Sequence, residues 1–275
     1  MNRLRVLFLG PSAVVISALF WAPLLIVVAY SFLTRGAYGG VSEPWTFESY
    51  RRVFDPLYVA ILWRSVWLSA VSTVLCVVIG FPVALYISRA ERHKTLLLNL
   101  VMLPFWTSFL IRTYAWMFLL RDTGFINTIL QSLRIVREPL PLLFNDGAVI
   151  LGLVYGYVPF AILPLFATLE KLDPVLLDAA ADLGASPLLT AWKVIVPLST
   201  PGVVAAFLLV FIPCLGAYLT PDLMGGGKTV MIGNLVQNQF TNARDWPFGS
   251  AVSLLLMAIV LLVTRLIGRR SEELL

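Results

Sequence analysis

Six long apolar runs are the feature that most constrains the fold of this chain. A helix of about 20 apolar residues spans the hydrocarbon core of a bilayer. The composition agrees, with 59% hydrophobic and 13% charged residues. We therefore predict an all-α, polytopic membrane protein whose single transmembrane domain covers residues 1–275. The six predicted transmembrane helices are 7–32, 61–87, 96–120, 148–169, 202–219 and 248–267.

The placement of basic residues predicts the orientation of these spans. Six spans put both termini on the same side of the membrane. The short connection 88–95 (SRAERHKT) and the two ends are dense in arginine and lysine, which favours the cytoplasmic side. The first apolar run lacks the small-residue cleavage site of a signal peptide, so we expect an uncleaved span. Both termini and the polar connection 170–201 are therefore expected in the cytoplasm.

The connection 170–201 has clear local signals for a helix, a turn and a second helix. Asp173–Pro174 combines a capping side chain with a proline, whose missing N–H costs nothing in the first helical turn. Gly184 can take the left-handed conformation that ends a helix. Ser186–Pro187 repeats the start signal, and we expect Pro197 and Pro201 to end the second helix. Both helices are too short to span a bilayer.

Cysteine and histidine are too few to indicate metal or disulfide chemistry. Cys76 and Cys214 lie inside apolar runs, and the only histidine, His93, lies in a basic connection. We therefore expect neither a disulfide framework nor a metal site. The net charge of +5 reflects arginines in loops, so no nucleic-acid partner is expected.

One stretch imitates a nucleotide-binding motif. Residues 225–229 (GGGKT) match the end of a phosphate-binding loop, but Asp222 stands where the motif needs its first glycine. No buried strand precedes the stretch, so a flexible glycine turn is the better interpretation. No nucleophile–base pair indicates a membrane enzyme either. We therefore predict that the chain is not an enzyme, and that any ATPase that energises it is another chain.

The central connection resembles the cytoplasmic motif of the permease subunits of bacterial ATP-binding-cassette importers. That motif is Glu-Ala-Ala, three residues, Gly, nine residues, then Ile-x-Leu-Pro. This chain has 178–180 (DAA), Gly184, and 194–197 (VIVP) at those places, so the spacing is intact with conservative departures. Composition alone favours an amphipathic loop lying on the membrane. The motif spacing favours coupling to an ATPase instead.

The resemblance extends over nearly the whole chain. Within the importer family, the chain is similar to the first permease of spermidine/putrescine importers. The matching stretches are 55–58 (DPLY), 103–116 (LPFWTSFLIRTYAW), 170–186 (EKLDPVLLDAAADLGAS), 221–226 (PDLMGG) and 242–251 (NARDWPFGSA).

This resemblance implies a type I importer architecture in the bacterial inner membrane, with 170–201 as the coupling loop. The implied partners are a second homologous permease, two ATPase subunits that carry ATP and Mg²⁺, a periplasmic or lipid-anchored substrate-binding protein, and membrane lipid. No cofactor is expected in this chain itself. The implied ATPase-coupling residues are Asp178, Ala179, Ala180, Gly184, Ala185 and Ser186.

A polyamine cargo would need carboxylates and aromatic faces along its path. No Asp or Glu lies deep within a predicted span, so the carboxylates are expected at the outer mouth, as Asp146, Asp222 and Asp245, of which the last two equally suit the binding protein. The aromatic residues equally suit packing or an interfacial belt. The candidates for the substrate path are Trp106, Tyr114, Tyr155, Tyr157, Tyr218, Asp222 and Asp245.

Several alternatives stay open from the sequence. Arg112 lies within a predicted span, where it can snorkel outward, pair with an outer carboxylate, or take part in gating. Gly152 and Gly156 favour close helix packing. The same machine could carry another small cation or an organic solute. A stand-alone ion-driven carrier or channel is the competing hypothesis from a different class.

Overall fold

The computed structural model describes residues 2–90 and 92–272. Contacts within the chain group it into two compact units, which we call the first unit (Met1–Ile61 with Leu235–Ile259) and the second unit (Leu62–Asn234 with Val260–Leu275). The expectation of one domain over residues 1–275 stays a prediction.

The first unit combines a long helix, a small hairpin and the start of the last helix. Its strands pair antiparallel, with Thr34 opposite Ser42. The hairpin is tied to the turn before the last helix, because the backbone N–H of Gly40 donates to the Arg244 carbonyl at 2.8 Å. The elements that lie in it wholly or in part are α1 (Asn2–Ser31), β1 (Thr34–Arg35), β2 (Val41–Ser42), α2 (Glu48–Val53), the start of α3 (Pro56–Arg89), α13 (Ile232–Thr241) and α14 (Trp246–Glu272).

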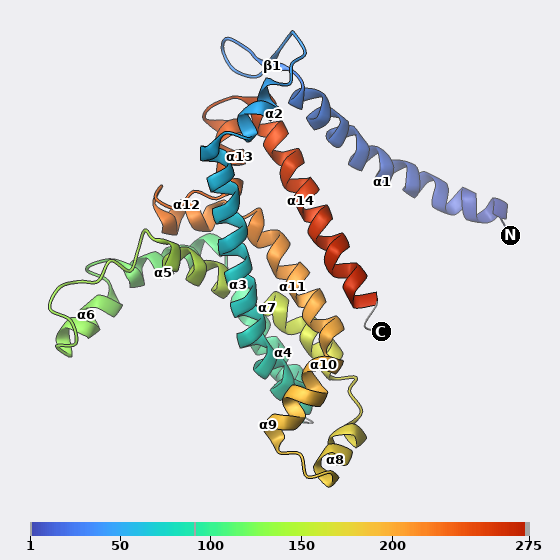
Figure 1. Ribbon diagram of the computed structural model, residues 1–275, viewed down its shortest axis with the longest axis vertical. Coiled ribbons are helices and arrows are strands. Elements are labelled where there is room, and N and C mark those ends of the chain that lie inside the picture. Colours follow the sequence, from blue (N-terminus) through green and yellow to red (C-terminus); the bar gives the residue numbers. More distant parts are fainter. Residues whose placement is uncertain (1, 91, 273–275) are drawn as a thin grey trace. The chain divides into compact units, whose positions relative to one another are not determined.

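In the described part of the second unit, all regular secondary structure is helical. This unit also holds most of the buried core. Helix α7 packs against α11 and α12, and α12 also contacts α5 (Figure 1). Its elements are α3 (Pro56–Arg89), α4 (Lys94–Met102), a 3₁₀ turn (Leu103–Trp106), α5 (Phe109–Leu120), α6 (Phe125–Ser132), α7 (Asp146–Leu169), α8 (Pro174–Asp182), α9 (Pro187–Thr190), a π turn (Ala191–Ile195), α10 (Val196–Leu198), α11 (Thr200–Leu215) and α12 (Leu219–Gly225).

Small residues allow α7 to approach its neighbours closely. A Cβ atom at Gly152 would lie 2.5 Å from the Met224 sulfur and 2.6 Å from a Thr220 methyl group, both on α12. A Cβ atom at Gly202 of α11 would lie 2.6 Å from the Thr168 hydroxyl on α7. Helices in lipid associate by close packing, because lipid tails are as apolar as the helices themselves. The expectation that Gly152 favours helix packing is confirmed.

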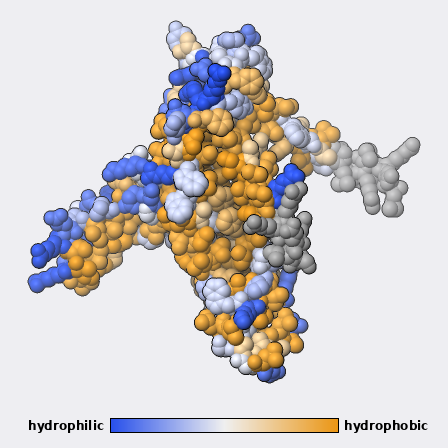
Figure 2. All heavy atoms as spheres, in the orientation of Figure 1, coloured by the Kyte–Doolittle hydropathy of each residue, from blue (hydrophilic) through white to orange (hydrophobic). Residues whose placement is uncertain are grey.

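Within residues 2–90 and 92–272, four uninterrupted helices and two bent pairs are long and apolar enough to span a membrane. Counting each bent pair as one span gives the predicted six. Exposed apolar side chains along α3 suit contact with lipid, and Figure 2 shows hydrophobic residues covering the surface there. The uninterrupted helices are Ser12–Ser31, Pro56–Arg89, Asp146–Leu169 and Trp246–Gly268. The bent pairs are Lys94–Trp106 with Phe109–Ser132, and Pro187–Leu198 with Thr200–Leu215.

The third span changes direction by 83° near Pro104. Proline cannot donate a helical hydrogen bond, and here it lies in the 3₁₀ turn between α4 and α5. Arg112, which the sequence also marked as an interruption, lies inside the regular helix α5. The proline breaks this span and the arginine does not.

The fifth span differs from its predicted bounds. The sequence placed it at 202–219, but α11 runs from Thr200 to Leu215 and a new helix starts at Leu219. Pro197 and Pro201 were expected to end the preceding helix, and it does end between them, at Leu198. The wide π turn just before Pro197 makes room for the proline ring. A bend of 68° follows at Ser199.

Candidate functional site

The central connection forms two short helices joined by a glycine turn (Figure 1). The Asp173 carboxylate accepts a hydrogen bond from the Val175 N–H at 3.0 Å, which caps α8. Gly184 has a φ of +80°, in the left-handed region that favours glycine. The Ser186 hydroxyl accepts from the Leu189 N–H at 3.4 Å and starts α9. The predicted start and stop signals of this segment are confirmed.

This segment exposes both its motif residues and large apolar side chains. Leu183, just before the glycine turn, is 89% exposed. Large apolar residues exposed together in a polar segment mark a surface that meets a partner. Four of the predicted coupling residues are exposed, while Ala180 is buried and Ala185 is half-buried. The exposed ones are Asp178, Ala179, Gly184 and Ser186.

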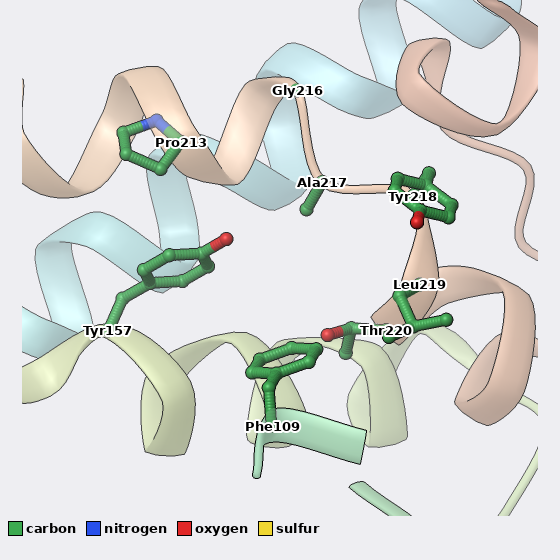
Figure 3. Close-up of a pocket in the computed structure, with 8 residues that line it drawn as sticks. All are labelled: Phe109, Tyr157, Pro213, Gly216, Ala217, Tyr218, Leu219 and Thr220. Atoms are coloured by element: carbon green, nitrogen blue, oxygen red, sulfur yellow. The ribbon is translucent and has the colours of Figure 1, made fainter. Parts of the chain in front are cut away.

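A cavity of about 340 Å³ lies between α5, α7 and the break that separates α11 from α12 (Figure 3). Two of the residues predicted for the substrate path, Tyr157 and Tyr218, line this cavity. The sequence did not single out Phe109 or Thr220, which also line it. No local pattern marks these two, because α5 and α12 meet α7 only in the folded chain. All side chains that line this cavity are uncharged.

The other predicted aromatic residues lie elsewhere in the second unit. Tyr155 packs edge-on against Trp116, with ring centroids 5.5 Å apart. Trp106 on the 3₁₀ turn is 83% exposed, and Tyr114 on α5 is also exposed. Their part in a substrate path stays a prediction.

Arg112 is buried among aromatic rings. Its guanidinium carbon lies 5.0 Å from the centroid of the Phe105 ring, 5.7 Å from that of Phe109 and 5.9 Å from that of Tyr155. Arg112 is 9% exposed. Its Nε and Nη1 atoms have no hydrogen-bond partner in the described part of the chain. Cation–π contacts therefore stabilise this charge here. Neither snorkelling nor an ion pair is seen among the described residues.

The two predicted carboxylates differ in their surroundings. Asp222, in the first turn of α12, is exposed. Asp245, in the first unit, is 2% exposed and forms an ion pair with Arg52 at 2.8 Å. Burial lowers the pKa of Arg52, but hydrogen bonds and charge interactions with Asp245 and Tyr58 together more than offset it, so the pKa is raised. The Asp245 carboxylate is thus engaged within this chain, and its role toward substrate or binding protein stays a prediction.

A polar cluster that the sequence did not predict joins three segments of the second unit. Arg64 on α3 donates to the Asp146 carboxylate at the start of α7 and to the Lys228 carbonyl. The Thr229 hydroxyl donates to the same Asp146 oxygen at 2.6 Å. The segment 225–229 was expected to be a flexible glycine turn; the hydrogen bonds at Lys228 and Thr229 instead tie one end of it to α3 and α7.

Comparisons with known proteins agree on one family. The chain is 43% identical to the spermidine/putrescine transport system permease protein PotB of Haemophilus influenzae, over 91% of this chain and 90% of that protein. It is 42% identical to the PotB protein of Escherichia coli K12, over 91% of this chain and 94% of that protein. No protein-family model matches the chain.

A solved structure shares the fold. The matching chain comes from the structure of a bacterial alginate ABC transporter in complex with an alginate pentasaccharide-bound periplasmic protein. The TM-score is 0.80 at 14% identity, and the match covers 99% of this chain and 96% of that one. An identity this low supports the architecture alone.

Proposed function

Because this chain belongs to the family of spermidine/putrescine transport permeases, we propose that it is the membrane-spanning permease subunit of an ATP-driven importer that carries polyamines inward. The observation that carries the proposal is the sequence identity of 42–43% to the PotB proteins over nine-tenths of the chain. The six-span helical fold, with two of its spans bent, suits a subunit that alternates between outward-open and inward-open forms.

The central connection is the proposed coupling element. ATP and Mg²⁺ would bind to two partner ATPase subunits, whose closure would be transmitted through Asp178, Ala179, Ala180, Gly184, Ala185 and Ser186. The exposed Leu183 supports this role, since it offers an apolar contact beside the glycine turn. The capping hydrogen bonds at both helix starts also support this role, because they order the two short helices.

Further partners follow from the same proposal. A second, homologous permease would complete the path, and a periplasmic or lipid-anchored binding protein would deliver the cargo. The chain would lie in the bacterial inner membrane with both termini in the cytoplasm. The uncharged lining of the cavity at Tyr157 suits a path that releases cargo, with selectivity resting on the binding protein.

Reconstitution tests this proposal against the rival carrier. The chain is co-expressed with its partner permease and ATPase, purified, and placed in proteoliposomes. The binding protein is added on the same side of the membrane as the spermidine. We expect spermidine uptake that requires ATP, the ATPase and the binding protein. Uptake by this chain alone, driven by an ion gradient, would overturn the importer and support a stand-alone carrier. Uptake of another solute in place of polyamines would overturn the cargo assignment only.

A further inference from the structure

The cavity lined by Tyr157 and Thr220 has the chemistry of a cation site. It lies between the C-cap of α11 at Gly216 and the start of α12 at Leu219. Backbone groups, side-chain hydroxyl groups and aromatic rings therefore line the same cavity. Figure 3 shows the Tyr157 phenol and the Thr220 hydroxyl pointing toward the same opening. We call it the break cavity.

The Thr220 hydroxyl lacks a partner that the fold would normally supply. The residue is 1% exposed, and its oxygen has no hydrogen bond within residues 2–90 and 92–272. A buried hydroxyl without a partner costs about 1–3 kcal/mol. A ligand with N–H donors, bound in the break cavity, would remove that cost.

The charges and dipoles around the break cavity favour a positive group. Helix α11 directs its C-terminal end, which carries partial negative charge, at the break. The N-terminal end of the short helix α12 opposes this, but Asp222 in its first turn offsets that partial positive charge. The rings of Phe109, Tyr157 and Tyr218 line the cavity, and aromatic rings of this kind can make cation–π contacts.

One neighbouring charge weakens such a site. The guanidinium carbon of Arg112 lies 5.7 Å from the centroid of the Phe109 ring, and Phe109 lines the break cavity. Two positive charges close together in a low-dielectric region repel each other. A cation would therefore occupy the cavity briefly, as transport requires.

We propose that the break cavity is a transient site for one ammonium group of the transported polyamine, held by hydroxyl oxygens and aromatic faces without a carboxylate. The proposal rests on the proposed function, since it takes the cargo to be a polyamine. The ammonium N–H groups donate to the Thr220 and Tyr157 oxygens, and the alkyl chain that follows lies against the Phe109 ring.

Hydroxyl deletions in the reconstituted complex test the site. Thr220→Val and Tyr157→Phe each remove one oxygen and keep the size of the side chain. We expect each to lower the number of spermidine molecules transported per ATP hydrolysed, roughly three- to tenfold. Thr220→Ser keeps the hydroxyl and should transport like wild type. Thr264→Val and Tyr86→Phe, on α14 and α3 and away from the cavity lining, are the matched controls.

The outcomes separate the site from the proposed function. Unchanged transport per ATP in both Thr220→Val and Tyr157→Phe would overturn the ammonium site. A Thr220→Ser variant as impaired as Thr220→Val would also overturn it, because packing would then explain the effect. Failure of the wild-type complex to transport any polyamine would overturn the proposed function instead. Each variant is first shown to assemble by co-purification with the ATPase, and Tyr157→Phe carries the test if Thr220→Val does not assemble.

Discussion

The Arg52 guanidinium donates a hydrogen bond of 2.8 Å to the Asp245 carboxylate, which is almost fully buried. The other oxygen of Asp245 accepts from the Phe248 N–H at 3.2 Å, so the same carboxylate caps the start of α14. The guanidinium carbon also lies 4.3 Å from the centroid of the Phe248 ring. One acidic residue thus joins α2 to the start of α14 within the first unit.

Removing this charge should destabilise the protein. Asp245→Asn leaves the Arg52 charge without its partner and weakens the cap, but Arg52 is 41% exposed and water compensates in part. We expect a loss of about 1–3 kcal/mol in the free energy of unfolding. Thermal unfolding of the detergent-solubilised protein, followed by circular dichroism, measures it. Asp222→Asn, at an exposed site, should change stability little, and equal losses in both variants would contradict the prediction.

Local features of the fold could be predicted from the sequence. Asp173, Gly184 and Ser186 act through their own neighbouring backbone, so their roles as caps and turn follow from residue type and spacing. The apolar runs likewise predicted the spans, because a bilayer requires a minimum helix length. These signals do not depend on how the helices pack.

Features that arise between segments could not be predicted. The aromatic surroundings of Arg112 come from the 3₁₀ turn, α5 and α7 together, and no single segment encodes them. The break cavity likewise needs Tyr157 and Thr220, which are far apart in the chain.

A bulky residue at the glycine turn should break the contact by which the permease stimulates the ATPase. Gly184 has a φ of +80°, and no atom lies within 4 Å of a Cβ placed there. Gly184→Val therefore meets backbone strain of about 1–2 kcal/mol without a clash inside the chain. We expect normal assembly but lost stimulation of the ATPase by loaded binding protein, since the side chain would stand in the proposed coupling contact.

A second glycine supplies the control for this variant. Gly227, in the segment between α12 and α13, has a φ of +76° and also has open space around its Cβ position. Gly227→Val introduces similar strain away from the proposed coupling element. Stimulated ATPase activity at the wild-type level in Gly184→Val, or an equal loss in both variants, would count against the coupling assignment.

Loss of Arg64 should loosen the glycine-rich segment 225–229. The Arg64→Ala variant lacks hydrogen bonds to Asp146, Thr229 and the Lys228 carbonyl. The Arg64 and Asp146 side chains are 39% and 44% exposed, so we expect about 1 kcal/mol of local stability to be lost. Amide hydrogen exchange in the segment should then speed up roughly fivefold.

The ion pair of Lys94 with Glu170 is the matched control for this change. Its side chains are 31% and 43% exposed, and it joins α4 to the end of α7. Lys94→Ala should leave exchange in 225–229 unchanged. If the segment exchanges equally fast in both variants, or is unaffected by Arg64→Ala, the cluster does not hold it.

A methyl group at Gly152 should disturb the contact between α7 and α12. Gly152→Ala favours the helix by up to about 1 kcal/mol, but its Cβ would lie 2.5 Å from the Met224 sulfur and 2.6 Å from the Thr220 methyl group. The Met224 side chain can turn away, but the branched Thr220 side chain cannot do so easily, so we expect a cost of about 1–3 kcal/mol. Gly268→Ala, on α14 with open space at its Cβ position, receives the same helix preference without the clash. We therefore expect a lower unfolding temperature for Gly152→Ala and an unchanged or higher one for Gly268→Ala; the reverse order would show that α7 and α12 are not packed through Gly152.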